Sequence, residues 1–397
     1  MNRGMLTLLW FGLAMTSEVS FAADGNALRL GISDELLLDG NLFRLPDGDR
    51  PFIEGNKRPR SDRINIATFS GSFDRVYSRQ RLVADISVSH HEYQEFKHLD
   101  YTAKNVRAGW YWAVGSMWSG VLVADQSQLP RSFSDRANTV RSVNTYRHYA
   151  FDARYLLHPE WMLGAGLARI DSRFDDRVSA SSEYVEDGLE ALATFRSMTG
   201  STFALVARAA DGRYPARTAS ETTVTAYDQR EIQVRIDWAA SAHSRITGYA
   251  GHTWREYPEL AEKNFSGPTG RLTYDWAPSS KVALGVTVRR EMGAREDVVD
   301  NFVVTRATSF DPVWSVTGKL RVRGRLEWLA RDYEGTPFIV SGPDRDEKGR
   351  SHSVSIEWSP MDDLLLRVGL RREHRSSSDA VRSYADDIIS VAIKYAL

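Results

Sequence analysis

The chain contains no cysteine, so disulfide bonds do not hold it together. It also lacks an excess of charge of either sign, because 51 basic residues stand against 52 acidic ones for a net charge of −1. This balance argues against nucleic acid as a partner. After residue 22, no apolar run approaches the length of about 18 residues that a membrane-spanning helix needs. Helical transmembrane spans are therefore excluded.

The first residues have the features of a signal peptide. Arg3 supplies a positive charge, Met5–Met15 is an apolar core of eleven residues, and Ser20-Phe21-Ala22 offers the small residues of a cleavage site. The apolar core is too short to span a bilayer. We therefore predict a signal peptide over residues 1–22, cleaved after Ala22, and export of residues 23–397 at least to a periplasm.

The last residues of the chain predict a strand. Ile389, Val391, Ile393, Tyr395 and Leu397 occupy every second position, with small or polar residues between them. Such a strand needs a pairing partner, because an open edge invites aggregation. It is similar to the closing strand of bacterial outer-membrane barrels, although those usually end in Phe or Trp. From this stretch alone, an edge strand of a soluble β protein is an equally good interpretation.

Aromatic residues mark a period of 37 to 44 residues along the whole chain: Phe73, Trp112, Tyr155, Phe195, Trp238, Trp276, Trp314, Trp358 and Tyr395. Most of them end an alternating stretch just before a short turn signal, such as Ala277-Pro278-Ser279-Ser280. A second alternating run follows each turn, and a longer polar loop leads to the next period. Each period therefore predicts two strands of about ten residues, the length that crosses a bilayer at a tilt.

Short turns at one end and long loops at the other are typical of outer-membrane barrels. An aromatic residue at the same height on every second strand suits a girdle at the membrane interface. Nine such markers predict an all-β fold, a transmembrane antiparallel up-and-down β-barrel of about 18 strands (16–18). A soluble β-propeller is the main alternative, because its blades also repeat at about 40–45 residues. It is disfavoured because each blade holds four short strands.

Several segments carry a resemblance to a known family. They are Asp39–Leu45 (DGNLFRL), Tyr77–Arg81 (YSRQR), Leu99–Tyr101 and Gly109–Trp112 (GWYW). These segments resemble EpsL-type outer-membrane proteins, which accompany exosortase-linked exopolysaccharide biosynthesis clusters in Gram-negative bacteria. The similarity is sharpest over residues 30–170, and Gly40 is a mild departure from the pattern.

The resemblance implies an outer-membrane barrel that acts in polysaccharide export, and it supplies no catalytic site. The implied partners are outer-membrane lipid, the exopolysaccharide, periplasmic export or biosynthesis proteins and the barrel-insertion machinery. The Asn41–Leu45 segment is expected to be structural, with Arg44 pointing inward near a strand end beneath a loop. Residues 46–59 and 126–144 are predicted to be polar loops.

If the apolar residues of each strand face lipid, the residues between them face the lumen. In the C-terminal half, this register places fourteen charged residues inside: Arg235, Asp237, Arg271, Asp275, Arg289, Glu291, Arg321, Arg323, Arg325, Glu327, Glu357, Arg367, Arg371 and Glu373. An arginine facing lipid at mid-bilayer would cost about 2–4 kcal/mol, which favours the inward register. The set, eight arginines and six carboxylates, can be a weakly basic path for a sugar polymer that bears uronic acids. It can equally be a salt-bridge network that stabilises or plugs the lumen.

Signals for catalysis or metal binding are missing. No G-x-S-x-G motif, glycine-rich nucleotide loop or metal-ligand cluster occurs. The adjacent His90 and His91 cannot chelate one ion, because neighbouring strand residues point to opposite faces. The sequence therefore predicts no catalytic residue, no metal, no cofactor and no enzymatic activity.

Together these observations predict an outer-membrane channel for passive exopolysaccharide export through a charged lumen. Two alternatives stay open. One is a non-conducting structural or anchoring component of the same machinery, and the other is a secreted propeller that binds glycans.

Overall fold

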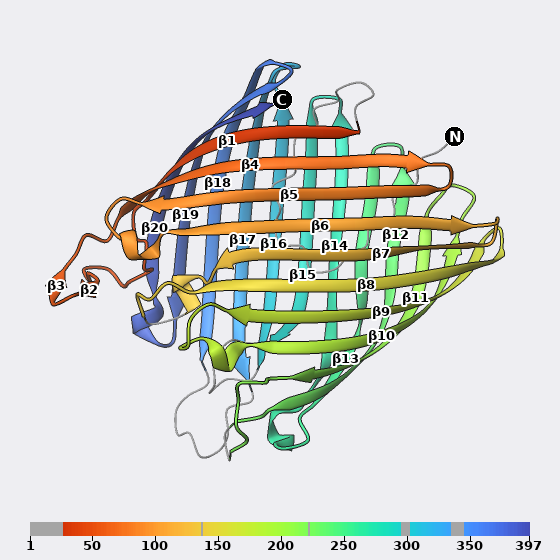
Figure 1. Cartoon of the computed structure of the whole chain (residues 1–397), viewed down its shortest axis with the longest axis horizontal. Coiled ribbons are helices and arrows are strands. Elements are labelled where there is room, and N and C mark those ends of the chain that lie inside the picture. The colour runs from red at the N-terminus through yellow and green to blue at the C-terminus, as the bar shows by residue number, and fades with distance from the viewer. Residues whose placement is uncertain (1–26, 136–137, 221–222, 295–301, 335–344) are drawn as a thin grey trace.

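A computed structural model describes residues 27–135, 138–220, 223–294, 302–334 and 345–397. The predicted signal peptide, residues 1–22, lies outside the described residues. Eighteen strands in the described part of the chain form one antiparallel sheet that closes on itself into a barrel (Figure 1). Figure 1 shows strands of the front and back walls crossing at a steep angle, as the strand tilt of a barrel produces.

Each barrel strand pairs with its neighbours along the chain. The strands are β1 (Leu28–Asp39), β4 (Asp62–Tyr77), β5 (Gln80–Tyr93), β6 (Tyr101–Val114), β7 (Trp118–Pro130), β8 (Val143–His158), β9 (Trp161–Phe174), β10 (Tyr184–Arg196), β11 (Thr202–Arg213), β12 (Ala226–Ser241), β13 (Ser244–Glu256), β14 (Phe265–Ser279), β15 (Val282–Ala294), β16 (Phe302–Ser315), β17 (Leu320–Glu334), β18 (Asp346–Met361), β19 (Leu364–Ser377) and β20 (Tyr384–Ala396). A small hairpin of β2 (Phe52–Ile53) and β3 (Asn56–Lys57) lies in the connection between β1 and β4.

The barrel closes between the first and the last strand. β1 pairs with β20 from Gly31 opposite Ala396 to Asp39 opposite Ile388. The amide of Leu397 donates a further hydrogen bond to the carbonyl of Leu30, at 2.9 Å. The strand predicted at the end of the chain is therefore confirmed as the closing strand, and this closure leaves the sheet without a free edge.

The outer face of the wall is apolar and the inner face is polar. Along β12, Ile232, Val234 and Trp238 are 53%, 43% and 45% exposed, whereas Gln233 is buried. β20 repeats the pattern with Ile389, Val391 and Ile393 outside. A closed barrel with an apolar exterior is the form in which strands satisfy their backbone groups inside a bilayer. The predicted transmembrane barrel is confirmed, and the propeller alternative is wrong.

The two ends of the barrel differ, which sets its orientation. At one end, short turns join the strands, for example residues 78–79 between β4 and β5 and residues 362–363 between β18 and β19. The first and last strands also start and end there. Short turns lie on the periplasmic side of such barrels. The opposite, extracellular end carries the longer connections, which contain the short 3-10 helices η1 (Lys97–Leu99), η2 (Phe133–Asp135), η3 (Ala180–Ser182), η4 (Ala261–Lys263) and η5 (Ala380–Arg382).

The strands are longer than predicted, at 12 to 16 residues. The polar loop predicted over residues 126–144 is wrong at both ends, because β7 continues to Pro130 and β8 begins at Val143. Polar residues in these positions reflect a wall that extends beyond the hydrocarbon layer into water. The change from apolar to polar residues therefore indicates where a strand leaves the hydrocarbon layer, and not where the strand ends.

Candidate functional site

The nine periodic aromatic residues lie on β4, β6, β8, β10, β12, β14, β16, β18 and β20, near the periplasmic turns and on the outward side of the wall. Neighbouring strands add two rings that the periodic search missed. Trp118 packs against Tyr155 with ring centroids 5.0 Å apart, and Trp161 packs against Phe195 at 5.3 Å. Both tryptophans directly follow a short turn, which is the signal that would have found them.

The candidate functional site is the charged inner wall of the barrel. The fourteen charged residues predicted to line the lumen alternate with the outward apolar residues of β12, β14, β15, β17, β18 and β19. They therefore share the inward face. Thirteen of them form ion pairs, and Asp275 is the member without an ion pair in the described part of the chain.

The ion pairs link strands that are adjacent, or separated by one strand, into a ladder around the wall. Between β14 and β15, Arg271 binds the carboxylate of Glu291 at 2.8 Å. The ladder continues from Arg289 to Glu327 of β17 at 2.9 Å. It reaches β18 where Arg323 binds Glu357, also at 2.9 Å.

Four partners in this ladder were missed by sequence reasoning. The missed residues are Glu190 of β10, Arg245 of β13, Asp311 of β16 and Glu35 of β1. Glu190 binds Arg235 at 2.5 Å, and Arg245 binds Asp237 at 2.5 Å. Asp311 binds Arg325 at 3.2 Å, and Glu35 binds Arg367 at 3.3 Å. With them the set holds nine arginines and nine carboxylates, so the formal charges within this set are balanced. Each missed residue alternates with outward residues on its own strand, and the same register would have identified it.

The ladder is hydrated toward the periplasmic side and in the middle of the barrel. The side chains of Arg321, Arg325 and Arg371 are 42%, 47% and 54% exposed. Ion pairs of this exposure contribute little to stability, typically about 0–1 kcal/mol each. They are correspondingly free to exchange partners with a polar solute.

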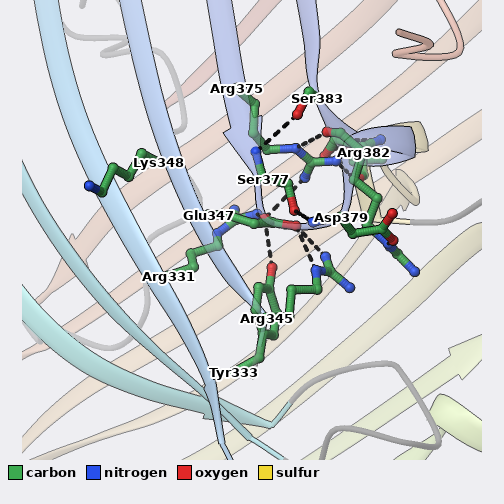
Figure 2. Close-up of polar contacts among 12 residues, drawn as sticks. Arg331, Tyr333, Arg345, Glu347, Lys348, Arg375, Ser377, Asp379, Arg382 and Ser383 are labelled. Atoms are coloured by element: carbon green, nitrogen blue, oxygen red, sulfur yellow. Dashed lines mark hydrogen bonds and ion pairs between the residues drawn. The ribbon is translucent and has the colours of Figure 1, made fainter. Parts of the chain in front are cut away.

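The extracellular end of the lumen is tightly packed. Glu347 of β18 has a side chain that is 1% exposed, and it accepts a hydrogen bond from the hydroxyl of Tyr333 at 2.7 Å (Figure 2). Three guanidinium groups surround it: Arg345, Arg375 at 3.3 Å and Arg331 at 3.7 Å. This buried carboxylate is stabilised because it has several charged partners at once.

Arg375 also holds a loop that crosses part of the extracellular mouth. Its guanidinium donates to the carbonyl of Ser134 in η2, which belongs to the β7–β8 connection. Five strands separate β19 from β7 around the barrel. Phe133 of the same turn packs edge-on against Phe43, with ring centroids 4.6 Å apart. The β7–β8 connection is thus tied to two distant parts of the wall.

The segment expected to bury an arginine near the end of β1 does so. The Arg44 guanidinium lies 2.9 Å from the carboxylates of both Asp39 and Asp386 and 3.7 Å from Glu373. Arg44 has a φ of 55°, a left-handed conformation that is unusual for a residue other than glycine. Burial alone would lower the pKa of Arg44, but the three carboxylates raise it, so the group stays charged.

A second packed cluster lies beneath the connections that follow β11 and β13. Tyr214, Tyr227 and Tyr257 are almost fully buried, and the guanidinium of Arg255 lies 4.0 Å from the ring centre of Tyr227. The Tyr227 hydroxyl donates to Glu186 at 2.5 Å. Burial raises the pKa of Tyr214, in the connection after β11, to about 12, so this phenol is neutral at physiological pH.

The described residues offer no centre for a metal ion. They contain no group of three or more His, Asp or Glu side chains with suitable geometry. His90 contacts Thr102 on the outward side, and His91 stacks on the Tyr101 ring at 4.3 Å on the inward side. The two rings therefore point apart, as the strand pattern predicts. No helix in the described ranges is long and apolar enough to cross a membrane.

Comparisons with known proteins agree with this architecture. No protein-family model and no curated protein sequence matches the chain. Among solved structures, the chain is similar to OccK2 (OpdF) from Pseudomonas aeruginosa, with a TM-score of 0.50 and 11% identity over 93% of this chain and 97% of that one. A second structure of OccK2, in complex with glucuronate, gives the same TM-score and identity over 93% and 98%. The chain thus has the fold of an outer-membrane porin, and its apolar exterior places it in the outer membrane of a Gram-negative bacterium.

Proposed function

We propose that the protein is an outer-membrane channel through which an exopolysaccharide leaves the cell. The observation that carries this proposal is the hydrated ladder of arginine–carboxylate pairs on the inner wall of β12–β19. A polysaccharide presents many hydroxyl groups, and an acidic one adds carboxylates that match the fork geometry of a guanidinium. The resemblance of the sequence to EpsL-type proteins supports the same assignment.

The mechanism is passive. Each guanidinium in the ladder can release its protein carboxylate and bind a sugar carboxylate or hydroxyl instead, because exposed ion pairs are weak. A polymer then moves along many exchangeable contacts without a single tight site. Direction comes from polymer synthesis or from periplasmic partners, and the barrel itself performs no bond chemistry. Glucuronate, the ligand in one OccK2 structure, is an acidic sugar of the class that this wall suits.

A second function is favoured by the packed extracellular end. Arg375, Arg44 and the tyrosine cluster tie the long connections to the wall, and these contacts suit a barrel that stays closed. In that case the protein is a non-conducting anchor of the export machinery. The two functions predict opposite results in an electrical measurement.

The test is single-channel conductance of the purified protein in a planar bilayer, with acidic and neutral oligosaccharides added to the periplasmic side. We expect discrete conductance steps that oligo-uronate blocks more strongly than a neutral oligosaccharide of the same length. Stable insertion without conductance steps would contradict the channel function and favour the anchor function. This result has to hold both in the wild type and in a variant whose β7–β8 connection is released from Arg375.

A ladder variant and a matched control sharpen this test. Arg323→Gln and Arg371→Gln together remove two inward cations of the ladder. We expect the block by oligo-uronate to weaken at least fivefold while the neutral sugar is unaffected. Arg230→Gln removes an exposed, outward-facing cation of β12 and should leave both blocks unchanged.

A further inference from the structure

The outer wall carries a group of cations that the lumen does not explain. On β15, β16 and β18, the outward register that holds Val288 and Ile356 continues toward the extracellular end with Arg290, Arg306, Lys348 and Arg350. We call these four residues the outer-wall basic cluster. An exposed cation on the lipid side of a barrel is unfavourable at mid-bilayer and is tolerated only near the interface.

The height of the cluster on the wall is fixed by the aromatic residues at the periplasmic end. Arg306 and Arg350 each lie eight residues from the tryptophan on their own strand, Trp314 and Trp358. Eight residues rise about 26 Å along a strand, or about 20 Å along the barrel axis at a tilt of about 40°. The apolar band of such barrels is about 25 Å tall. The outer-wall basic cluster therefore lies near the outer-leaflet boundary.

The cluster surrounds a shallow groove with a volume of about 650 Å³. Arg290, Arg306, Lys348 and Arg350 line it together with Val288 and the half-exposed Trp328. The aliphatic and indole groups form an apolar floor, and the cations stand at the side nearer the extracellular end. A site of this kind offers one end to an anionic headgroup and the other to acyl chains.

The positive charge is largely uncompensated. Arg306 pairs with Asp332, whereas Arg290, Lys348 and Arg350 form no ion pair with any carboxylate in the described part of the chain. Lys348 points away from the Glu347 cluster in Figure 2. Arg290 and Arg306 lie directly opposite each other on paired strands, an arrangement of like charges that is destabilising by itself. A bound anion would remove this repulsion.

A break in the strand pairing opens the groove at one side. The ladder between β14 and β15 ends where Gly270 pairs with Arg290. Beyond it, Pro268 has no amide hydrogen to donate, and its carbonyl accepts a hydrogen bond from the Arg290 guanidinium. Arg290 is thus held at the edge of the groove by a neutral carbonyl, and no carboxylate among the described residues offsets its positive charge.

We propose that the outer-wall basic cluster binds the phosphate groups of a phosphorylated glycolipid in the outer leaflet, with its acyl chains on the apolar floor. Four cations, of which only Arg306 is paired with a carboxylate within the described ranges, match a headgroup that carries two phosphates. Arginine favours such a headgroup because its planar fork binds phosphate oxygens in pairs. Bound lipid would fix the vertical position of the barrel and stabilise the wall beneath its long connections.

The test measures binding of fluorescent diphosphoryl lipid A to the purified full-length barrel in neutral detergent. We expect the variant Arg290→Gln/Arg306→Gln/Lys348→Gln/Arg350→Gln to bind at least tenfold more weakly than the wild type. Arg230→Gln is the matched control, because it removes an outward cation near Asp228 and Asp211, and it should bind like the wild type. Heat-modifiable gel mobility checks that every variant is folded.

The chemistry of the probe separates the possible ligands. We expect fully dephosphorylated lipid A to bind the wild type as weakly as the diphosphoryl form binds the fourfold variant. Equal binding of the two lipids would overturn the proposal, because it would assign the affinity to the acyl chains. Displacement of diphosphoryl lipid A by inorganic phosphate at equal concentration would also overturn it, because a free anion would then be the better ligand.

Discussion

The tie between Arg375 and the β7–β8 connection is the contact whose loss should change the protein most visibly. Arg375 is 5% exposed and donates to Ser134 and to the carbonyl of Arg382, while also pairing with Glu347. A hydrogen bond from a charged donor contributes about 1.5–3 kcal/mol. Arg375→Met should therefore raise the population of the released connection about ten- to a hundredfold. Glu347 remains paired with Arg345, so the barrel itself should stay folded.

Hydrogen exchange and conductance together measure this release. We expect the amides of residues 131–135 to exchange at least tenfold faster in Arg375→Met, and the conductance of the inserted barrel to rise. Arg372→Met is the matched control on the same strand, because its side chain is 71% exposed and faces outward. Equal exchange in residues 131–135 in the two variants and in the wild type would show that Arg375 does not hold the connection.

Three further predictions concern stability. Arg44→Met leaves the buried carboxylates of Asp39 and Asp386 unpaired. The free energy of unfolding in urea, measured for the barrel in liposomes, should therefore fall by about 3–5 kcal/mol. An unchanged midpoint of urea unfolding would show that Arg44 does not stabilise these carboxylates. Gly120→Val should abolish refolding, because a Cβ at Gly120 would lie 2.0 Å from the Asp152 carbonyl oxygen. Refolding is measured by heat-modifiable gel mobility, and normal refolding would show that the wall can shift to accept the side chain. Burial opposes ionisation of Asp176 in the β9–β10 connection, but hydrogen bonds from Ser142 and Ser179 lower its pKa below the ordinary 3.8. The stabilisation that the Asp176 carboxylate gives to this connection is therefore fully present above pH 3.8 and is lost as the pH falls through the lower pKa of the folded state. The protection of the Ser179 amide against hydrogen exchange should decrease in acid in the wild type and be independent of pH in Asp176→Asn.

The barrel could be predicted because two separate sequence patterns indicate its wall. The alternation of outward Ile, Val and Leu with inward polar residues gives the strands, and the aromatic residue near each periplasmic turn counts them. Both signals depend only on the bilayer, which imposes the same apolar band on every strand. The strand number and the inward register of residues such as Arg271 and Glu357 follow from this local pattern.

Contacts between distant strands could not be predicted in the same way. Glu35 of β1 reaches Arg367 of β19 only because the barrel closes, and Ser134 reaches Arg375 only because η2 turns inward. Neither contact leaves a periodic trace in the chain. The balance of the lumen charges depends on such partners, which is why the sequence alone suggested an excess of arginine.

We propose that an acidic sugar polymer passes through this barrel, and efflux from proteoliposomes measures this passage without an electrical readout. A fluorescently labelled oligo-uronate and a neutral oligosaccharide of equal length would be trapped together in liposomes with and without the inserted protein. We expect the wild-type protein to release the oligo-uronate faster than the neutral sugar, and Arg375→Met to release it faster still. Retention of both sugars in liposomes that contain folded wild-type and Arg375→Met barrels would contradict it.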